Sequence, residues 1–151
     1  MMNIVEGIAE NEKLNVIGWS YDYFNHVIDI NNFIMIIMSD TNWEKSLKLV
    51  DDEGNILGVY LLGDSQLKDY SLYSRLNGVH GVLLAVDSEI RGLGWGNKLK
   101  DYPKTMGYSY IWGEQLKSLN NIKDWLKRRD LLADTNYSYI TAELFLDYYK
   151  K

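Results

Sequence analysis

The chain has 151 residues, 16 of them basic and 21 acidic, so its formal net charge is 16 − 21 = −5. Cysteine is absent and only two histidines occur, which excludes disulfides, cysteine-ligated zinc, a thiol nucleophile and an all-histidine metal site. The hydrophobic fraction of 46% and the charged fraction of 25% are typical of a globular protein, and the length predicts one domain, residues 1–151. The acidic balance argues against nucleic acid as a partner and favours a cationic one.

No targeting or membrane segment is predicted. The first residues lack a basic stretch followed by an apolar one, and the longest apolar run, 33–38, has six residues where a membrane-spanning helix needs ~20. We therefore expect a cytoplasmic protein with no membrane partner.

Apolar residues in the first 40 positions recur at steps of three and four, which is typical of a helix. The run 33–38 fits a short buried strand equally well, so both alternatives stay open. The residues with helical spacing are Trp19, Tyr23, Val27, Ile30, Ile34, Ile37 and Met38.

Two strands, 46–50 and 56–62, are predicted on either side of the acidic, glycine-containing turn 51–55, which together form an antiparallel hairpin. The turn lacks the ligand spacing of a calcium loop, so we interpret it as a solvated turn. A third strand is predicted at 79–86, where a nearly continuous apolar run indicates burial on both faces.

A helix is predicted from about residue 94 to 105, and Pro103 is expected to kink or end it. A fourth strand, 108–112, stops at Gly113. The strand–helix–strand order predicts that the third and fourth strands pair in parallel, which with the hairpin gives a mixed sheet and the α/β class. A further helix over 122–132 and a last strand at about 136–145 complete the chain.

Three glycines, Gly92, Gly94 and Gly96, stand at alternate positions between the third strand and its helix. Glycine allows a positive φ and close approach of a ligand to the backbone, and N–H groups at a helix N-terminus attract anions. Arg91 adds a positive charge. The segment predicts a phosphate or pyrophosphate site, and the alternative is a glycine-rich turn without a ligand.

Neither of two common nucleotide-binding motifs matches this loop in full. A P-loop string is absent, and a dinucleotide fingerprint would need glycine where Asn97 stands and more βα units than the chain can supply. Glu114, about twenty residues on, could take the place of a ribose-binding acid, so a dinucleotide-binding module remains an alternative.

The string Arg91-Gly92-Leu93-Gly94-Trp95-Gly96 resembles the R/Q-x-x-G-x-G/A signature of the GNAT (GCN5-related N-acetyltransferase) superfamily, and the order of elements over 45–146 resembles that family too. The resemblance implies a single-domain, mixed and mostly antiparallel sheet flanked by helices, with the third and fourth strands parallel and splayed. Residues 1–44 would form the acceptor side.

The cofactor implied by the resemblance is acetyl-CoA. Backbone amides of the loop would bind its pyrophosphate, the backbone of the third strand would pair with its pantetheine arm, and the asparagine at the start of the late helix would add a contact. The residues carried over are Ile90, Arg91, Gly92, Leu93, Gly94, Trp95, Gly96 and Asn97 in the loop, Leu84, Ala85 and Val86 in the strand, and Asn121.

The reaction implied is direct attack of a primary amine on the thioester in a ternary complex. An alkyl ammonium with a pKa of about 10.4 must first lose a proton. His80 stands where some family members place a basic carboxylate, and it shares a strand face with Leu84 and Val86. The alternative for His80 is a structural histidine, and Glu114 is the second candidate base.

The family often has a tyrosine in the late helix that protonates the leaving thiolate, but Lys127 or Arg128 stands there in this chain. Tyr137 or Tyr139 would supply the acid, or none is needed because a thiol with a pKa near 8.5 leaves readily.

The acceptor side is rich in aromatic and acidic residues, which suit a cationic amine, although an aromatic cluster also suits a core. These are Trp19, Tyr21, Tyr23, Phe24, Asp22, Asp29 and Asp40. The acceptor, small molecule or protein, is not specified, and dimers are common in the family. A catalytically inactive GNAT-fold binding or regulatory protein is the alternative function.

Overall fold

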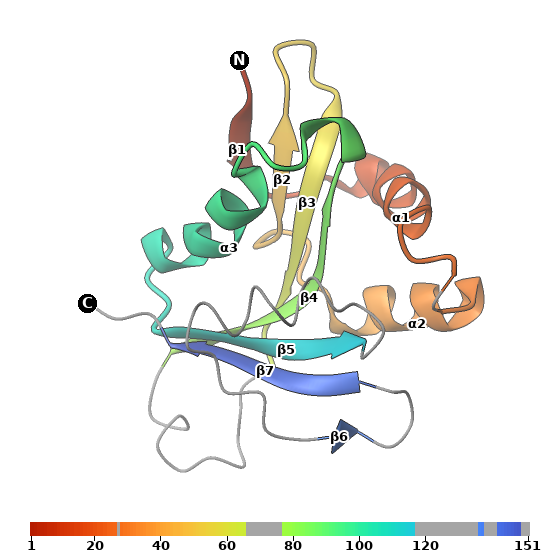
Figure 1. Ribbon diagram of the computed structural model, residues 1–151, viewed down its shortest axis with the longest axis vertical. Coiled ribbons are helices and arrows are strands. Elements are labelled where there is room, and N and C mark those ends of the chain that lie inside the picture. The colour runs from red at the N-terminus through yellow and green to blue at the C-terminus, as the bar shows by residue number, and fades with distance from the viewer. Residues whose placement is uncertain (27, 66–76, 117–135, 138–141, 149–151) are drawn as a thin grey trace. The chain divides into compact units, whose positions relative to one another are not determined.

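The computed structural model describes residues 1–26, 28–65, 77–116, 136–137 and 142–148 (Figure 1). These residues belong to two compact units. The first consists of Met1–Asp64 and Val82–Tyr102, and the second of the described residues within Ser65–Gly81 and Pro103–Lys151.

Within the described residues, the strands form one sheet in the order β1-β2-β3-β4-β5-β7-β6. The strands are β1 (Asn3–Glu6), β2 (Leu47–Val50), β3 (Ile56–Gly63), β4 (Gly78–Val86), β5 (Tyr110–Leu116), β6 (Asn136–Tyr137) and β7 (Ala142–Tyr148). The helices are α1 (Lys13–Tyr21), α2 (Ile30–Asp40) and α3 (Trp95–Thr105), with short 3-10 turns η1 (Glu10–Glu12) and η3 (Ser88–Ile90).

The strand pairing confirms the predicted mixed α/β sheet. The hairpin of β2 and β3 is antiparallel, β4 pairs with β5 in parallel, and β5 pairs with β7 antiparallel. The parallel ladder has four residue pairs, from Gly78↔Tyr110 to Gly81↔Gly113, and both strands continue beyond the last pair.

The N-terminal third differs from the single helical spacing predicted for it. It contains the short strand β1, which was not predicted, and two helices in place of one continuous pattern. The side chain of Asp29 caps α2 by accepting the N–H of Asn32 at 2.9 Å, and this cap starts a new helix in the middle of the predicted one. The run 33–38 is helical, and of its residues Phe33 and Ile37 are buried while Ile34 is partly exposed.

Two other predicted bounds are wrong, and so is the expectation that the third helix could end at Pro103. The fourth predicted strand, β5, starts at Tyr110 and runs through Gly113 to Leu116. The single strand expected at 136–145 is two strands, β6 and β7. Pro103 lies inside α3, which continues to Thr105. The helix predicted at 122–132 lies outside the described residues.

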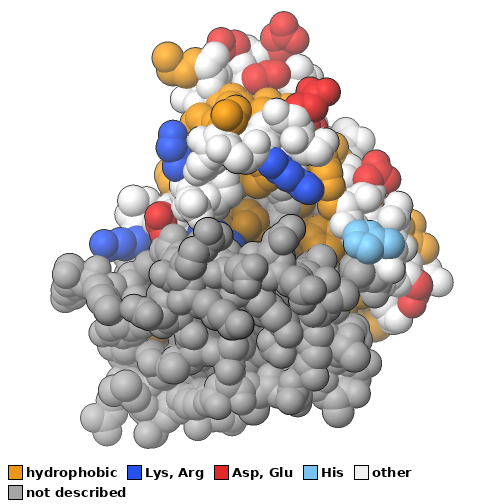
Figure 2. Space-filling model, viewed as in Figure 1, with side chains coloured by type: hydrophobic (Ala, Val, Ile, Leu, Met, Phe, Trp, Pro, Cys, Tyr) orange, Lys and Arg blue, Asp and Glu red, His pale blue; other side chains and the backbone are white. Residues whose placement is uncertain are grey.

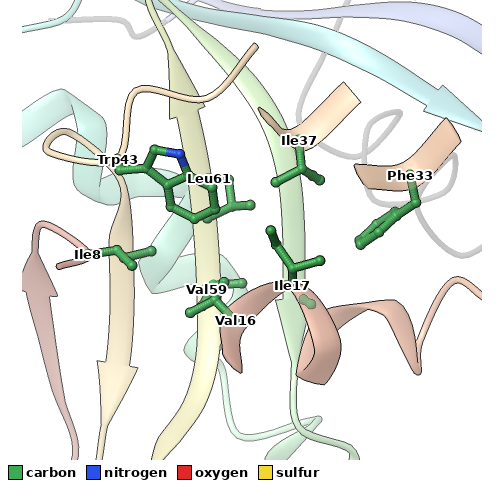
Figure 3. Close-up of a cluster of buried hydrophobic side chains, with 9 residues drawn as sticks. Ile8, Val16, Ile17, Phe33, Ile37, Trp43, Val59 and Leu61 are labelled. Carbon is green, nitrogen blue, oxygen red and sulfur yellow. The ribbon is translucent and has the colours of Figure 1, made fainter. Parts of the chain in front are cut away.

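The core of the first unit lies where α1 and α2 cover one face of the sheet at β3 and β4. Figure 3 shows side chains of both helices directed toward Val59 and Leu61 of β3. The buried set is Ile8, Val16, Ile17, Phe33, Ile37, Trp43, Val59, Leu61 and Ala85. Burial of these apolar side chains is the main source of stability for this unit.

The opposite face of β2 and β3 is covered by α3 (Figure 1). Leu99 of α3 is fully buried, and its Cδ1 lies 3.3 Å from the point that a Cβ on Gly58 would occupy. The missing side chain at Gly58 therefore lets the helix approach the sheet closely. No helix among the described residues is long and apolar enough to cross a membrane.

In the second unit, the ring of Tyr110 lies directly over Gly78, its partner in the parallel ladder. Tyr110 is fully buried, and a Cβ built on Gly78 would lie 2.0 Å from its Cζ. A side chain at position 78 would therefore occupy space that the ring already fills.

The variant Gly78→Ala is expected to lower the free energy of unfolding by about 1–3 kcal/mol, because the new methyl group overlaps the Tyr110 ring. The matched control is Gly18→Ala in α1, where nothing lies within 4 Å of a Cβ. Gly18→Ala is expected to raise that free energy by about 0.5–1 kcal/mol, since alanine is the better helix former. Chemical denaturation measures both, and an equal effect of the two substitutions would contradict the assigned packing.

Candidate functional site

The chain passes from β4 to α3 through a short turn that is anchored to the sheet. Asp87 donates its N–H to the carbonyl of Leu57 on β3 at 2.8 Å. Its carboxylate accepts the N–H of Glu89 at 2.9 Å, and its carbonyl accepts the N–H of Ile90 at 3.1 Å, which closes η3. The glycine loop therefore begins from a fixed point at the end of β4.

The loop needs glycine because of its backbone conformation, and not because a side chain would clash with a described neighbour. Gly92 has φ +84° and Gly94 has φ +89°, a left-handed conformation that L side chains rarely adopt. Among the described residues, nothing lies within 4 Å of a Cβ built at either position. A Cβ on Gly96 would have only the Val86 side chain of these residues near it, at 3.9 Å, so none of them fills the space over the three glycines.

Several N–H groups of the loop have no acceptor among the described residues. The first hydrogen bond of the α3 ladder runs from the N–H of Lys98 to the carbonyl of Gly94 at 3.1 Å, so the N–H groups before it precede the helix. Those of Gly92, Gly94, Trp95 and Gly96 donate no hydrogen bond to any described residue. Together with the helix dipole, they form a cradle suited to an anion.

Arg91 lies on the surface at the start of this cradle. Its Nε donates to the carbonyl of Val86 at 3.1 Å, and its Cζ lies 5.0 Å from the ring centroid of Tyr23. The Nη groups keep four N–H donors, which are able to pair with an oxyanion. Acidic, basic and hydrophobic side chains alternate over the described part of the face in Figure 2, without a basic patch there.

The other predicted cofactor residues lie within the loop or next to it in the sequence. Leu84, Val86 and Ile90 are half-buried and Ala85 is buried, whereas Leu93 and Asn97 are exposed. Beyond Gly81 the β4–β5 ladder has no further pair, so the backbone from Val82 to Val86 has no β5 partner among the described residues. Asn121 lies outside the described residues.

His80 is described within the second unit, where it is buried with 6% of its surface exposed. Its imidazole stacks on the indole of its ladder partner Trp112, with centroids 4.2 Å apart and planes 10° apart, and Trp112 donates its Nε1–H to the carbonyl of Ser65 at 2.8 Å. Burial lowers the pKa of His80 to about 4, so the imidazole is neutral at pH 7. Its Nδ1 has no hydrogen-bond partner among the described residues.

Of the remaining candidate acids and bases, two have a known backbone position in the sheet, and the others lie outside the described residues. Glu114 lies on β5 opposite Leu144, and Tyr137 lies on β6 opposite Ala142. Tyr139, Lys127 and Arg128 lie outside the described residues. Their roles stay predictions.

The aromatic residues of the acceptor side pack at the edge of the core. Trp19 and Tyr23 are in edge-to-face contact at 5.3 Å, and Tyr21 and Phe24 both contact Phe33, at 5.0 and 6.1 Å. Of the acidic residues, Asp29 serves as the cap of α2, whereas partial burial raises the pKa of Asp40.

Sequence reasoning did not find the contact of Arg91 with Tyr23 or that of His80 with Trp112. The first joins residues 91 − 23 = 68 positions apart, so no local spacing could indicate it. The second follows from the parallel register, which the strand–helix–strand order predicts only in direction.

Comparisons with known proteins show the fold. No protein-family model matches the chain, and no curated protein matches its sequence. Solved structures do match. A GNAT-family acetyltransferase from Staphylococcus aureus Mu50 is 16% identical with a TM-score of 0.69, and 99% of this chain aligns with 100% of that one. NAA60 of Arabidopsis thaliana in complex with acetyl-CoA is 13% identical with a TM-score of 0.71, over 99% and 100% of the two chains.

Ard1 from Thermoplasma volcanium is likewise similar, at 15% identity and a TM-score of 0.66 over 99% of each chain. At these sequence identities, the similarity shows a shared backbone fold and nothing more. The chain has the fold of the GNAT acetyltransferases, as the signature at 91–96 predicts.

The stability of the protein is expected to fall as the pH falls from about 6.5 to about 4. In that range the unfolded chain takes up a proton on His80 that the folded chain does not, because the folded-state pKa is lowered. The full effect is about 3 kcal/mol, present above pH 6.5 and lost toward pH 4. Urea denaturation at pH 7 and pH 5, compared between the wild type and His80→Gln, measures it.

The imidazole proton resonances provide a direct check that does not depend on a variant. A titration midpoint near 6.5 for His80 would contradict the burial of its side chain.

Proposed function

We propose that this protein is an N-acyltransferase that transfers an acetyl group from acetyl-CoA to a primary amine by direct attack in a ternary complex. The observation that carries the proposal is the cradle between β4 and α3, where left-handed Gly92 and Gly94 lie beside Arg91 and their N–H groups have no acceptor in the described part of the chain. The GNAT fold supports it, because the chain's fold is shared with NAA60, a structure of which contains acetyl-CoA.

The cradle fits the diphosphate of coenzyme A. Its donors are backbone N–H groups and a guanidinium, which suit phosphate oxygens, and the open space at the three glycines admits a bulky anion. We assign Ile90–Asn97 to the diphosphate. Asn121 is kept as a proposed contact.

The pantetheine arm is proposed to run along β4. An extended chain is able to pair with the free edge of a strand, and the backbone of Leu84, Ala85 and Val86 has no β5 partner among the described residues. An N–H of this segment would orient the thioester carbonyl and polarise it.

When bound, acetyl-CoA supplies the activated acyl thioester, and the protein's residues provide orientation and proton transfer. His80 is proposed as the base that takes the amine proton at Nδ1. The imidazole is neutral at pH 7, and its Nδ1 has no hydrogen-bond partner among the described residues. Its low pKa makes it a weak base, so Glu114 remains the second candidate. Tyr137 and Tyr139 are proposed as donors to the leaving thiolate.

The acceptor is proposed to be an amine-bearing small molecule or protein that approaches from residues 1–44. The net charge of −5 favours a cationic acceptor. The aromatic side chains there are partly buried against the core, so part of this cluster serves packing. The chemical class of the acceptor stays open.

One observation favours a second candidate, a GNAT-fold protein that binds the cofactor without turnover. The imidazole of His80 is buried and stacked on Trp112, an environment that also suits a structural histidine. The dinucleotide module has less support, because the described pairings of β2, β3, β5 and β7 are antiparallel where a dinucleotide-binding domain has a parallel sheet.

The wild type is expected to bind acetyl-CoA, and Gly94→Ala is expected to weaken binding at least about tenfold, because the left-handed backbone at 94 shapes the cradle. Gly54→Ala is the matched control, since Gly54 has φ +81° and equally open space but lies in the β2–β3 turn. Both variants should lose similar stability, and calorimetry should find the affinity lowered in one only. A wild type that fails to bind at millimolar acetyl-CoA contradicts the proposed function.

Turnover is expected with at least one amine in a panel of peptides, polyamines and aminoglycosides, followed through release of free CoA thiol. Loss of the true base should lower kcat by about 10²–10⁴-fold. His80→Gln and Glu114→Gln test the two candidates. If the protein binds acetyl-CoA, yet no amine in the panel is acetylated, the second candidate function replaces the first.

A further inference from the structure

The arginine at the start of the cradle is held more firmly than an exposed side chain of its length would be on its own. Arg91 is exposed, and a free arginine loses about 2 kcal/mol of rotamer entropy when it is fixed by a ligand. In this structure, two contacts restrict it before any ligand is present. The bond from Nε to the carbonyl of Val86 fixes one end of the guanidinium, and the ring of Tyr23 covers its face.

Tyr23 is itself fixed from the core. It follows α1, where its N–H donates to the carbonyl of Ser20 at 3.1 Å. Its ring is half-buried against the core cluster and meets Trp19 edge-to-face at 5.3 Å with planes 65° apart. The face that it presents to Arg91 is therefore held by packing and not by the arginine.

We propose that Tyr23 is a positioning residue of the anion cradle, which holds the guanidinium of Arg91 in the orientation that receives the cofactor's diphosphate. The inference rests on the proposed function. An arginine over an aromatic ring is attracted to the ring through its charge, and its planar fork of N–H donors stays available to a ligand. With Nε occupied by Val86, the Nη edge is the part left for a bidentate contact with phosphate oxygens.

Tyr21, two residues earlier, shows what a purely structural tyrosine of this segment does. Its hydroxyl donates to the carbonyl of Ile28 at 2.8 Å, and its ring packs on Phe33, away from the cradle. The contact of Tyr23 with Arg91 uses the ring face, so phenylalanine should replace it and leucine should not.

The test measures the dissociation constant of CoA by calorimetry for the wild type and three variants. Tyr23→Leu should bind about two- to fivefold more weakly, the range of an exposed cation–π contact. Tyr23→Phe should bind as the wild type does. Tyr21→Leu should lose stability but keep the wild-type dissociation constant. On an Arg91→Met background, Tyr23→Leu should cause no further loss.

Three results would overturn the inference: wild-type affinity in Tyr23→Leu, an equal loss in Tyr23→Phe, or additive losses in the double variant. A wild type that does not bind CoA is a failure of the proposed function. The positioning role is then decided by exchange of the Arg91 Nε–H with solvent, measured by nitrogen-15 NMR and assigned with Arg91→Lys. Slower exchange in the wild type and Tyr23→Phe than in Tyr23→Leu supports it, and equal rates refute it.

Discussion

The contact of Leu99 with Gly58 determines where α3 lies on the sheet, and the rest of the candidate site depends on it. Because Gly58 has no side chain, Leu99 is buried directly on the backbone of β3. The helix then starts close to the end of β4, and the connection must be short. The 3-10 turn and the left-handed residues Gly92 and Gly94 make that connection, and the N–H groups of the two glycines have no acceptor among the described residues. Core packing thus fixes the place of the proposed anion cradle.

Much of the fold could be predicted because its signals are local. The β2–β3 hairpin has an alternating strand β2, an apolar strand β3 and, between them, a turn in which Asp51 accepts the N–H groups of Glu53 and Asn55. Strand β4 is a nearly continuous apolar run. β1 could not be found, since its four residues are mostly exposed and show no alternation. The break between α1 and α2 was missed because apolar spacing continues across it, whereas the helix start depends on the Asp29 cap.

The candidate site divides in the same way. The glycine loop and Arg91 are contiguous in the sequence, so their place between a strand and a helix could be predicted from residue types alone, and the anion site there stays a prediction. The acid–base behaviour of His80 could not be predicted from the sequence. A strand position and an ordinary pKa near 6.5 suggest a good base, but burial of the imidazole lowers that pKa to about 4. Such properties depend on neighbours that only the folded chain supplies.

Gly78 and Tyr110 have a consequence for how this sequence is able to change over evolution. The two residues face each other in the parallel ladder, and the ring of one fills the volume that the other lacks. Neither position is free to vary alone, because a larger residue at 78 requires a smaller one at 110, and a smaller one at 110 leaves a cavity. Relatives of this protein should therefore exchange volume between these two positions in pairs, which makes them a marker of the shared register of β4 and β5.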